Sequence, residues 1–150
     1  RSSDLEIFCE RSESGYILVD LDTQEINRID LEFQMEPIVI AANRKISYDA
    51  RKAAIIMGPL LYCFESIDNG SEIEELGLYA QGELETKRNS IAGKEINTIY
   101  AKGTRRRELE GDTLYGVYQE MKEDVKITAI PYFLWNNRGE GEMKVWIPVE

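Results

Sequence analysis

Residues 52–65, with the sequence KAAIIMGPLLYCFE, decide the fold class. Two mostly apolar runs, Lys52–Met57 and Leu60–Glu65, flank the dipeptide Gly58-Pro59. Proline lacks the N–H that a strand ladder needs and glycine weakens a strand interior, so the dipeptide indicates a bulge or an edge crossing rather than a helix. The stretch therefore predicts two short β-strands separated by Gly58-Pro59.

Alternation with a period of two extends the strand pattern toward both ends of the chain. Residues 29–36, IDLEFQME, place four apolar side chains on one face of a strand and four polar ones on the other. This is the clearest strand in the sequence. Further strands are expected at residues 5–9, 16–19, 37–41, 96–101, 114–118, 125–134 and 143–147.

Polar and glycine-rich segments separate the predicted strands. Residues 71–76 begin like a capping box and predict one helical turn, and residues 82–95 predict a loop or an exposed hairpin. The run NNRGEG at 136–141 lies between the last two predicted strands, which should form a hairpin. With roughly nine short strands and no long amphipathic helix, we predict an all-β fold, an antiparallel β-sandwich of jelly-roll type with at most short helical turns. All of residues 1–150 belong to this sandwich region, with one internal join expected near residues 66–71, between a middle sandwich and the C-terminal one.

The composition excludes several classes of function. The 150 residues include 18 Lys and Arg against 28 Asp and Glu, so the net charge is −10, and there is no His. An acidic chain repels phosphate, so a nucleic acid is not expected as a partner. Without His there is neither a Ser-His-Asp triad nor an imidazole ligand for zinc. The longest apolar stretch, 53–64, is interrupted by Gly and Pro and is shorter than the ~20 residues of a membrane span, so no membrane partner is expected. The composition suits a cytoplasmic and an exported bacterial protein equally.

Several motifs that look chemical are better explained as structure. Cys9 and Cys63 are interpreted as two small buried residues rather than as a disulfide or a metal-binding pair. The acidic run at 72–75 should be a solvated face, and the basic run RRR at 105–107 should lie in a solvated loop screened by neighbouring acids. The sequence NGS at 69–71 fits a glycosylation sequon, which is weak on its own.

Aromatic residues concentrate near the C-terminus, at Tyr132, Phe133, Trp135 and Trp146. Such side chains bury large areas, so we favour a core or a domain interface for them. The alternative is a platform on which sugar rings stack. The candidate contacts to a sugar or to an interface are Tyr132, Trp135, Arg138 and Trp146. No catalytic, cofactor-binding or metal-binding residue is assigned.

Three segments together resemble glycoside hydrolase family 127, the β-L-arabinofuranosidase type. Residues 57–69, MGPLLYCFESIDN, resemble its GPLVYCLE…DN motif. Residues 130–147, IPYFLWNNRGEGEMKVWI, are similar to its PYYAWANRGPGEMRVW signature. Gly15-Tyr16 followed by residues 28–35 resembles the family's GY…GD…L.LPM strands. All three occur in the family's order, and the second match is long enough to be specific.

The resemblance implies a place within a parent enzyme. Family members carry an (α/α)6 barrel followed by β-sandwich domains, and the three motifs belong to the sandwich part. The family's cysteine nucleophile, its acid/base glutamate and a zinc bound by Glu and Cys residues lie in the barrel, and no residue of this chain matches those positions. Cys63 matches the cysteine of YCLE on a sandwich strand and is not assigned as a nucleophile. Residues 24–28, QEINR, depart from the family's usual Trp and Gly-Asp, which leaves the substrate open.

We therefore expect a non-catalytic accessory region of a β-L-arabinofuranosidase-like glycoside hydrolase, with no cofactor in this chain. It would pack on the catalytic barrel of the same parent chain or on a homodimer partner, and it would have no turnover of its own. The alternative is a stand-alone carbohydrate-binding module that uses Trp135 and neighbouring aromatic residues.

Overall fold

The structure is a computed structural model, and it describes residues 12–19, 28–30, 32–107, 114–117 and 121–150. The chain divides into two compact units, Arg1–Glu32 and Phe33–Glu150.

In the first unit, the described residues include a tight turn at 12–16. The carbonyl of Tyr16 accepts hydrogen bonds from the N–H (3.0 Å) and the hydroxyl (2.9 Å) of Ser12. Gly15 has a φ of +84°, which glycine adopts without strain. The turn expected before Tyr16 is confirmed, but within the strand predicted after it only Ile17 takes part in a bridge.

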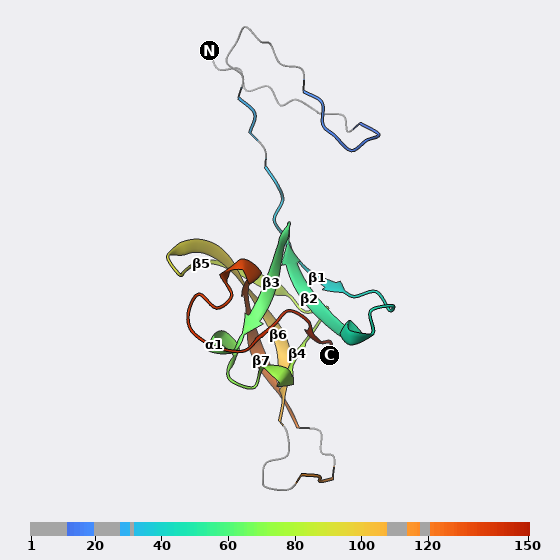
Figure 1. The fold of residues 1–150 in the computed structure, drawn as a ribbon, viewed down its shortest axis with the longest axis vertical. Coiled ribbons are helices and arrows are strands. Elements are labelled where there is room, and N and C mark those ends of the chain that lie inside the picture. Colours follow the sequence, from blue (N-terminus) through green and yellow to red (C-terminus); the bar gives the residue numbers. More distant parts are fainter. Residues whose placement is uncertain (1–11, 20–27, 31, 108–113, 118–120) are drawn as a thin grey trace. The chain divides into compact units, whose positions relative to one another are not determined.

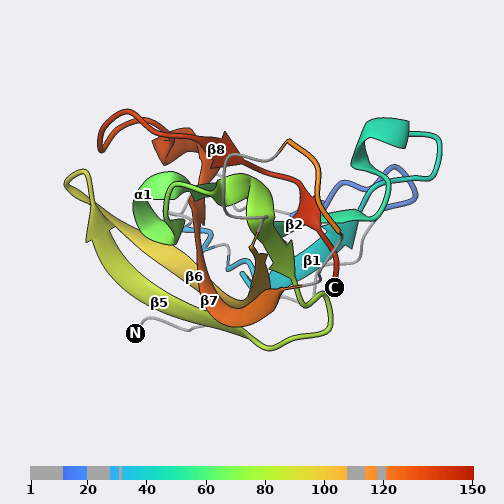
Figure 2. The same ribbon diagram turned by 90° about the horizontal axis from the view of Figure 1, so that it is seen from below.

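The second unit contains one curled, mainly antiparallel sheet (Figures 1 and 2). Its strands are β1 (Pro37–Ala41), β2 (Lys52–Met57), β3 (Leu60–Glu65), β4 (Leu76–Leu78), β5 (Leu84–Ile91), β6 (Lys94–Arg106), β7 (Lys122–Pro131), β8 (Met143–Lys144) and β9 (Ile147–Pro148). Short helical turns connect some of them, namely η1 (Ser47–Asp49), α1 (Ser66–Asn69), η2 (Ile73–Glu75) and η3 (Tyr132–Leu134). The predicted all-β fold with only short helical turns is confirmed.

The strand order explains how the sheet curls. Neighbours pair in the order β1-β2-β3-β7-β6-β4, and β5 adds to β6. At 13 residues, β6 is long enough to pair with β5 along its first part and with β4 near its end. β8 pairs with the end of β3 and β9 with the start of β2, while an isolated parallel bridge joins Leu78 to Val149. The C-terminal segment therefore connects β2 with β4.

Gly58-Pro59 forms the two-residue connection of the β2-β3 hairpin. Met57 pairs with Leu60 across it. Gly58 has a φ of +56°, and the sulfur of Met35 occupies the place that a Cβ on Gly58 would need. Glycine is required here for both backbone conformation and space. The dipeptide is thus a hairpin turn, and the expected bulge or edge crossing is corrected.

Both faces of the sheet are buried where β3 crosses β7. The larger core cluster consists of Ala53, Ile55, Met57, Tyr62, Phe64, Ile73, Leu76, Leu78, Ile99, Ala101, Ile127, Ala129 and Ile147. The smaller cluster consists of Cys63, Ile96, Ile130 and Leu134. Cys63 lies between Tyr62 and Phe64 in β3, so its side chain points to the opposite face of the sheet. The smaller cluster is therefore a second core, to which η3 contributes Leu134.

Two of the predicted strands are wrong. No strand is assigned to the described residues 28–30 and 32–36, where Ile29 and Phe33 are 52% and 74% exposed. Likewise, residues 114–117 form no strand, and Tyr115 is 93% exposed. An alternating pattern becomes a strand only where a neighbouring strand accepts and donates its backbone hydrogen bonds. The strand predicted at 5–9 lies outside the described residues.

The hairpin predicted between residues 125–134 and 143–147 is also wrong. β7 pairs with β6 and β3, whereas β8 and β9 pair with β3 and β2. Residues 135–142 therefore carry the chain from β7 to β3 instead of turning back along β7. The hairpin at 82–95 is confirmed as the pair of β5 with β6, and the helical turn at 71–76 as η2.

Residues 66–71 contain α1 and lie within the unit Phe33–Glu150, while the division between the two units falls at Glu32. The join between two sandwiches near residues 66–71 stays a prediction, because it concerns the domains of a longer protein.

Close packing of β4 on β6 gives a prediction for Gly103. A Cβ there would collide with the carbonyl oxygen of Gly77 and with Ile127. We expect Gly103→Ala to lower the free energy of unfolding by about 3 kcal/mol, because backbone atoms of two paired strands cannot move apart without breaking the ladder. The control is Gly93→Ala, where a Cβ meets no atom within 4 Å and only the φ of +73° is unfavourable, at about 1 kcal/mol. Urea unfolding measures both; equal losses would contradict the packing argument.

Candidate functional site

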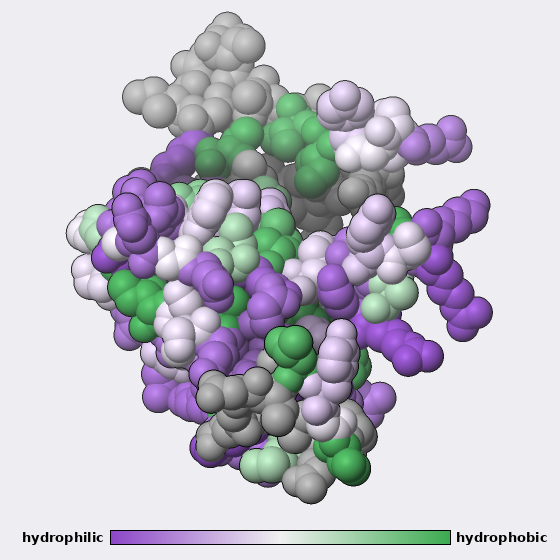
Figure 3. Space-filling view, turned by 60° about the horizontal axis from the view of Figure 1, so that its bottom comes forward, coloured by the Kyte–Doolittle hydropathy of each residue, from purple (hydrophilic) through white to green (hydrophobic). Residues whose placement is uncertain are grey.

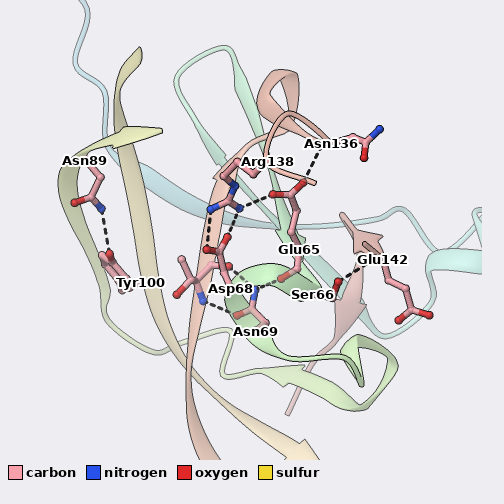
Figure 4. A network of polar contacts seen from close by, with 10 residues as sticks. Glu65, Ser66, Asp68, Asn69, Asn89, Tyr100, Asn136, Arg138 and Glu142 are labelled. Carbon is pink, nitrogen blue, oxygen red and sulfur yellow. Dashed lines mark hydrogen bonds and ion pairs between the residues drawn. The ribbon is translucent and has the colours of Figure 1, made fainter. Parts of the chain in front are cut away.

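The strongest polar contacts of the described chain join the end of β3 to the loop at 135–142 (Figure 4). Glu65, the last residue of β3, is 5% exposed. One of its carboxylate oxygens accepts a hydrogen bond from the guanidinium of Arg138, and the other accepts one from the backbone N–H of Asn136 at 2.9 Å. Both oxygens of this buried carboxylate are therefore paired.

Arg138 also binds Asp68 in α1 with two nitrogens, in the forked geometry that suits a carboxylate. The hydrogen bond to Asp68 raises the pKa of Arg138, burial acts in the opposite direction, and the bond to Glu65 raises it further. One guanidinium thus faces two carboxylates. Its Nε is buried and has no hydrogen-bond partner within the described residues.

Asn69 connects the same short helix to β7. Its side-chain oxygen accepts a hydrogen bond from the N–H of Thr128 (2.8 Å), and its side-chain nitrogen donates to the carbonyls of Thr128 (2.8 Å) and Glu65 (2.9 Å). The amide group therefore replaces a neighbouring strand's backbone along β7. Arg105 donates to the carbonyl of Asn69 itself. Because Asn69 is only 6% exposed, the sequon at 69–71 has its asparagine inside the fold.

Ser66 completes the connection to the loop. Its N–H donates to the carbonyl of Glu142 at 2.9 Å, and its hydroxyl accepts from the N–H of Glu142 at 3.0 Å. We call Glu65, Ser66, Asp68, Asn69 and Arg138 the polar network (Figure 4). It connects two segments about 70 residues apart in the sequence.

Next to this network, η3 presents aromatic side chains to solvent. Tyr132 and Trp135 are each 42% exposed, and their ring centroids lie 6.1 Å apart with an angle of 29° between the planes. A 3₁₀ turn has three residues per turn, so residues three apart lie on the same side. We call this pair the aromatic platform. Phe133 is also exposed, with the ammonium of Lys94 at 5.7 Å from its ring centroid.

The four residues singled out by the sequence do not form one cluster. Tyr132 and Trp135 form the platform, whereas the guanidinium of Arg138 faces the carboxylates of the polar network. Trp146 is half-buried between Val145, which packs on the second core, and Ile147, which belongs to the first. A sugar or interface contact for any of these residues stays a prediction.

Cys63 lies in the second core and is fully buried. Burial, and to a smaller extent the charge of Glu65, raises the pKa of its thiol to about 12. The described residues contain no group of three or more His, Cys, Asp or Glu side chains that could hold a metal ion. A buried, protonated thiol is a poor zinc ligand, so these residues do not fit a zinc site. The part of the chain that the structure describes has no helix able to cross a membrane.

The basic run at 105–107 is not the solvated loop that the sequence indicates. Arg105 and Arg106 belong to β6, which ends at Arg106. All three arginines form ion pairs, with Glu72 at 3.6 Å, Glu150 at 2.6 Å and Glu123 at 2.9 Å respectively. The acidic run at 72–75 is largely exposed as expected, but Glu72 and Glu74 each pair with a basic residue.

The sequence interpretation did not assign a role to Glu65, Asp68 or Asn69. A signal was present: Glu65 ends an apolar run whose neighbours are fully buried, and a carboxylate there needs a basic partner. The identity of that partner was not readable, because Arg138 lies 73 residues away.

Comparisons with known proteins agree on one family. The family described as glycoside hydrolase family 127 C-terminal domain matches residues 37–148. A non-reducing end β-L-arabinofuranosidase from Bifidobacterium longum is 28% identical over 142 residues, which cover 89% of this chain and 21% of that protein.

Solved structures give the same picture. The crystal structure of a GH127 β-L-arabinofuranosidase from Geobacillus stearothermophilus is similar with a TM-score of 0.72 and 33% identity, over 77% of this chain and 18% of that one. Another GH127 β-arabinofuranosidase has a TM-score of 0.65 and 28% identity, over 77% of this chain and 17% of that one. The chain spans about a fifth of the length of these relatives.

The buried ion pair gives a stability prediction. We expect Arg138→Met to lower the free energy of unfolding by about 3 kcal/mol, because it leaves Glu65 buried without its cation. The matched control is Arg88→Met, which removes an ion pair whose side chains are 75% and 59% exposed and should cost under about 0.5 kcal/mol. Urea unfolding followed by circular dichroism compares the two. Equal costs would show that Glu65 does not depend on Arg138.

Burial of Cys63 predicts an unreactive thiol. In a Cys9→Ser variant, where Cys63 is the only cysteine, a disulfide reagent such as DTNB should not react at pH 8 with the folded protein. It should react rapidly in urea, where the thiol regains an ordinary pKa. Fast reaction in the folded state would contradict both the burial and the raised pKa.

Proposed function

Because the chain belongs to the glycoside hydrolase family 127 C-terminal domain family, we propose that it is a non-catalytic accessory region of a larger β-L-arabinofuranosidase-like enzyme. The observation that carries the proposal is the match over residues 37–148, which contain the whole sheet, combined with a chain that spans about a fifth of its relatives. In this proposal, hydrolysis of the glycosidic bond takes place in the remaining part of the parent protein.

The chemistry of the polar network supports a structural role. Glycosidases that work with two carboxylates keep both groups open to the sugar, about 5 to 9 Å apart, on either side of the bond. Here Glu65 and Asp68 share one guanidinium, and Glu65 is 5% exposed. Neither group is placed to protonate a leaving group or to attack an anomeric carbon. Cys63 is buried and protonated, so it is not a nucleophile.

We propose that the catalytic barrel of the same parent chain, or a second copy in a homodimer, covers part of the sheet's surface. On the face drawn in Figure 3, hydrophobic residues lie in small patches among hydrophilic ones. Ile38 in β1 and Ile67 in α1 are 51% and 54% exposed. A mixed surface of this kind suits contacts between domains of one chain, which are more polar than obligate dimer interfaces. The zinc that the family resemblance implies would belong to the barrel.

An activity measurement tests the proposal. We expect the purified 150-residue chain to release no arabinose from an aryl β-L-arabinofuranoside, with or without added zinc, because the described residues place no acid, base or nucleophile at an open site. The matched control is the Cys63→Ser variant, purified in the same way. Equal traces of activity in both would identify a contaminant, whereas activity that Cys63→Ser abolishes would overturn the proposal.

A further inference from the structure

The aromatic platform has the geometry of a binding surface. Tyr132 and Trp135 are nearly parallel, with 29° between their ring planes, and both remain 42% exposed. Phe133, which lies between them in sequence, has a cation over its ring and is not part of the stacked pair. Two adjacent, similarly oriented aromatic rings offer a broad apolar surface to a flat ligand face.

The platform is rigidly mounted. Leu134, between the two halves of the turn, is 2% exposed and packs in the second core. The N–H of Trp135 donates to the carbonyl of Tyr132 at 3.0 Å, and the N–H of Asn136 is bound by the buried carboxylate of Glu65. A ligand would therefore find the rings already in place, which lowers the entropic cost of binding.

Polar groups at the rim of the platform are uncharged. The side-chain amide of Asn136 points outward, away from the polar network (Figure 4). The amide of Asn137 donates to the carbonyl of Trp135 at 3.3 Å. The charge of Arg138 is already balanced by the polar network. Apolar faces beside neutral amides match a sugar, which has an apolar ring face and hydroxyl groups around it.

We infer that the aromatic platform of Tyr132 and Trp135 binds a neutral oligosaccharide by ring stacking, with Asn136 as a hydrogen-bonding partner for its hydroxyl groups. That the oligosaccharide contains arabinofuranose rests on the proposed function; the stacking site itself does not. Bound in this way, a glycan would be kept near the catalytic part of the parent protein without being cleaved by this chain.

Tryptophan fluorescence tests the site. The chain has two tryptophans, so a Trp146→Phe variant leaves Trp135 as the only reporter. In that background we expect arabinofuranose oligosaccharides to protect Trp135 from acrylamide quenching, in a saturable way at millimolar concentrations. Adding Tyr132→Ala should weaken binding about tenfold, since it removes one of the two stacked faces. The matched control is Tyr48→Ala, which removes a tyrosine that is 88% exposed on η1 and should leave binding unchanged.

The outcomes separate the two proposals. Protection by cello-oligosaccharides but not by arabinofuranose oligosaccharides would support the stacking site and contradict the arabinose-specific function. No protection by any glycan at roughly 10 mM, or equal protection in the Tyr132→Ala variant, would overturn the site. Light scattering decides the remaining case, because a dimer that Tyr132→Ala dissociates would make the platform a protein interface and overturn sugar binding.

Discussion

Most of the fold's long-range order depends on the buried carboxylate of Glu65. A charge at 5% exposure is unfavourable unless a cation and hydrogen-bond donors surround it. Arg138 and the N–H of Asn136 supply these from a loop that follows β7. With that loop fixed on β3, the next residues can pair with β3 as β8 and then with β2 as β9. One ion pair therefore determines the path of the last part of the chain.

That path also explains why the sheet is buried on both faces. The first core fills one face of the curled sheet, while Cys63, Ile96 and Ile130 point the other way. The segment after β7 covers them with Leu134, and Met143 and Val145 pack at the edge of the cluster. Exposed aromatic rings on η3 are a by-product of this cover, since a turn that buries Leu134 directs its neighbours outward. The same contacts that complete the core thus mount the aromatic platform.

Sequence patterns predicted those parts of the fold whose signals are local. β1, β2 and β3 were predicted with their bounds, because apolar runs and the Gly58-Pro59 break are visible within a few residues. Residues 29–36 had the best alternation and still form no strand over the described part, since alternation says nothing about whether a partner strand is adjacent. The aromatic residues were identified, but the ion pair of Glu65 was not, because its partner lies 73 residues away.

The two longest motifs that resemble the family lie on the two sides of one polar network. The segment with Glu65, Asp68 and Asn69 and the segment with Asn136, Arg138 and Glu142 contact each other through charges and backbone hydrogen bonds. Their spacing is required by folding, because a buried carboxylate, its guanidinium and the amide that replaces a strand partner must all be present together. Similarity in these motifs therefore reports how the C-terminal domain folds. It carries no catalytic group with it, so an enzyme's activity cannot be transferred to a chain on these motifs alone.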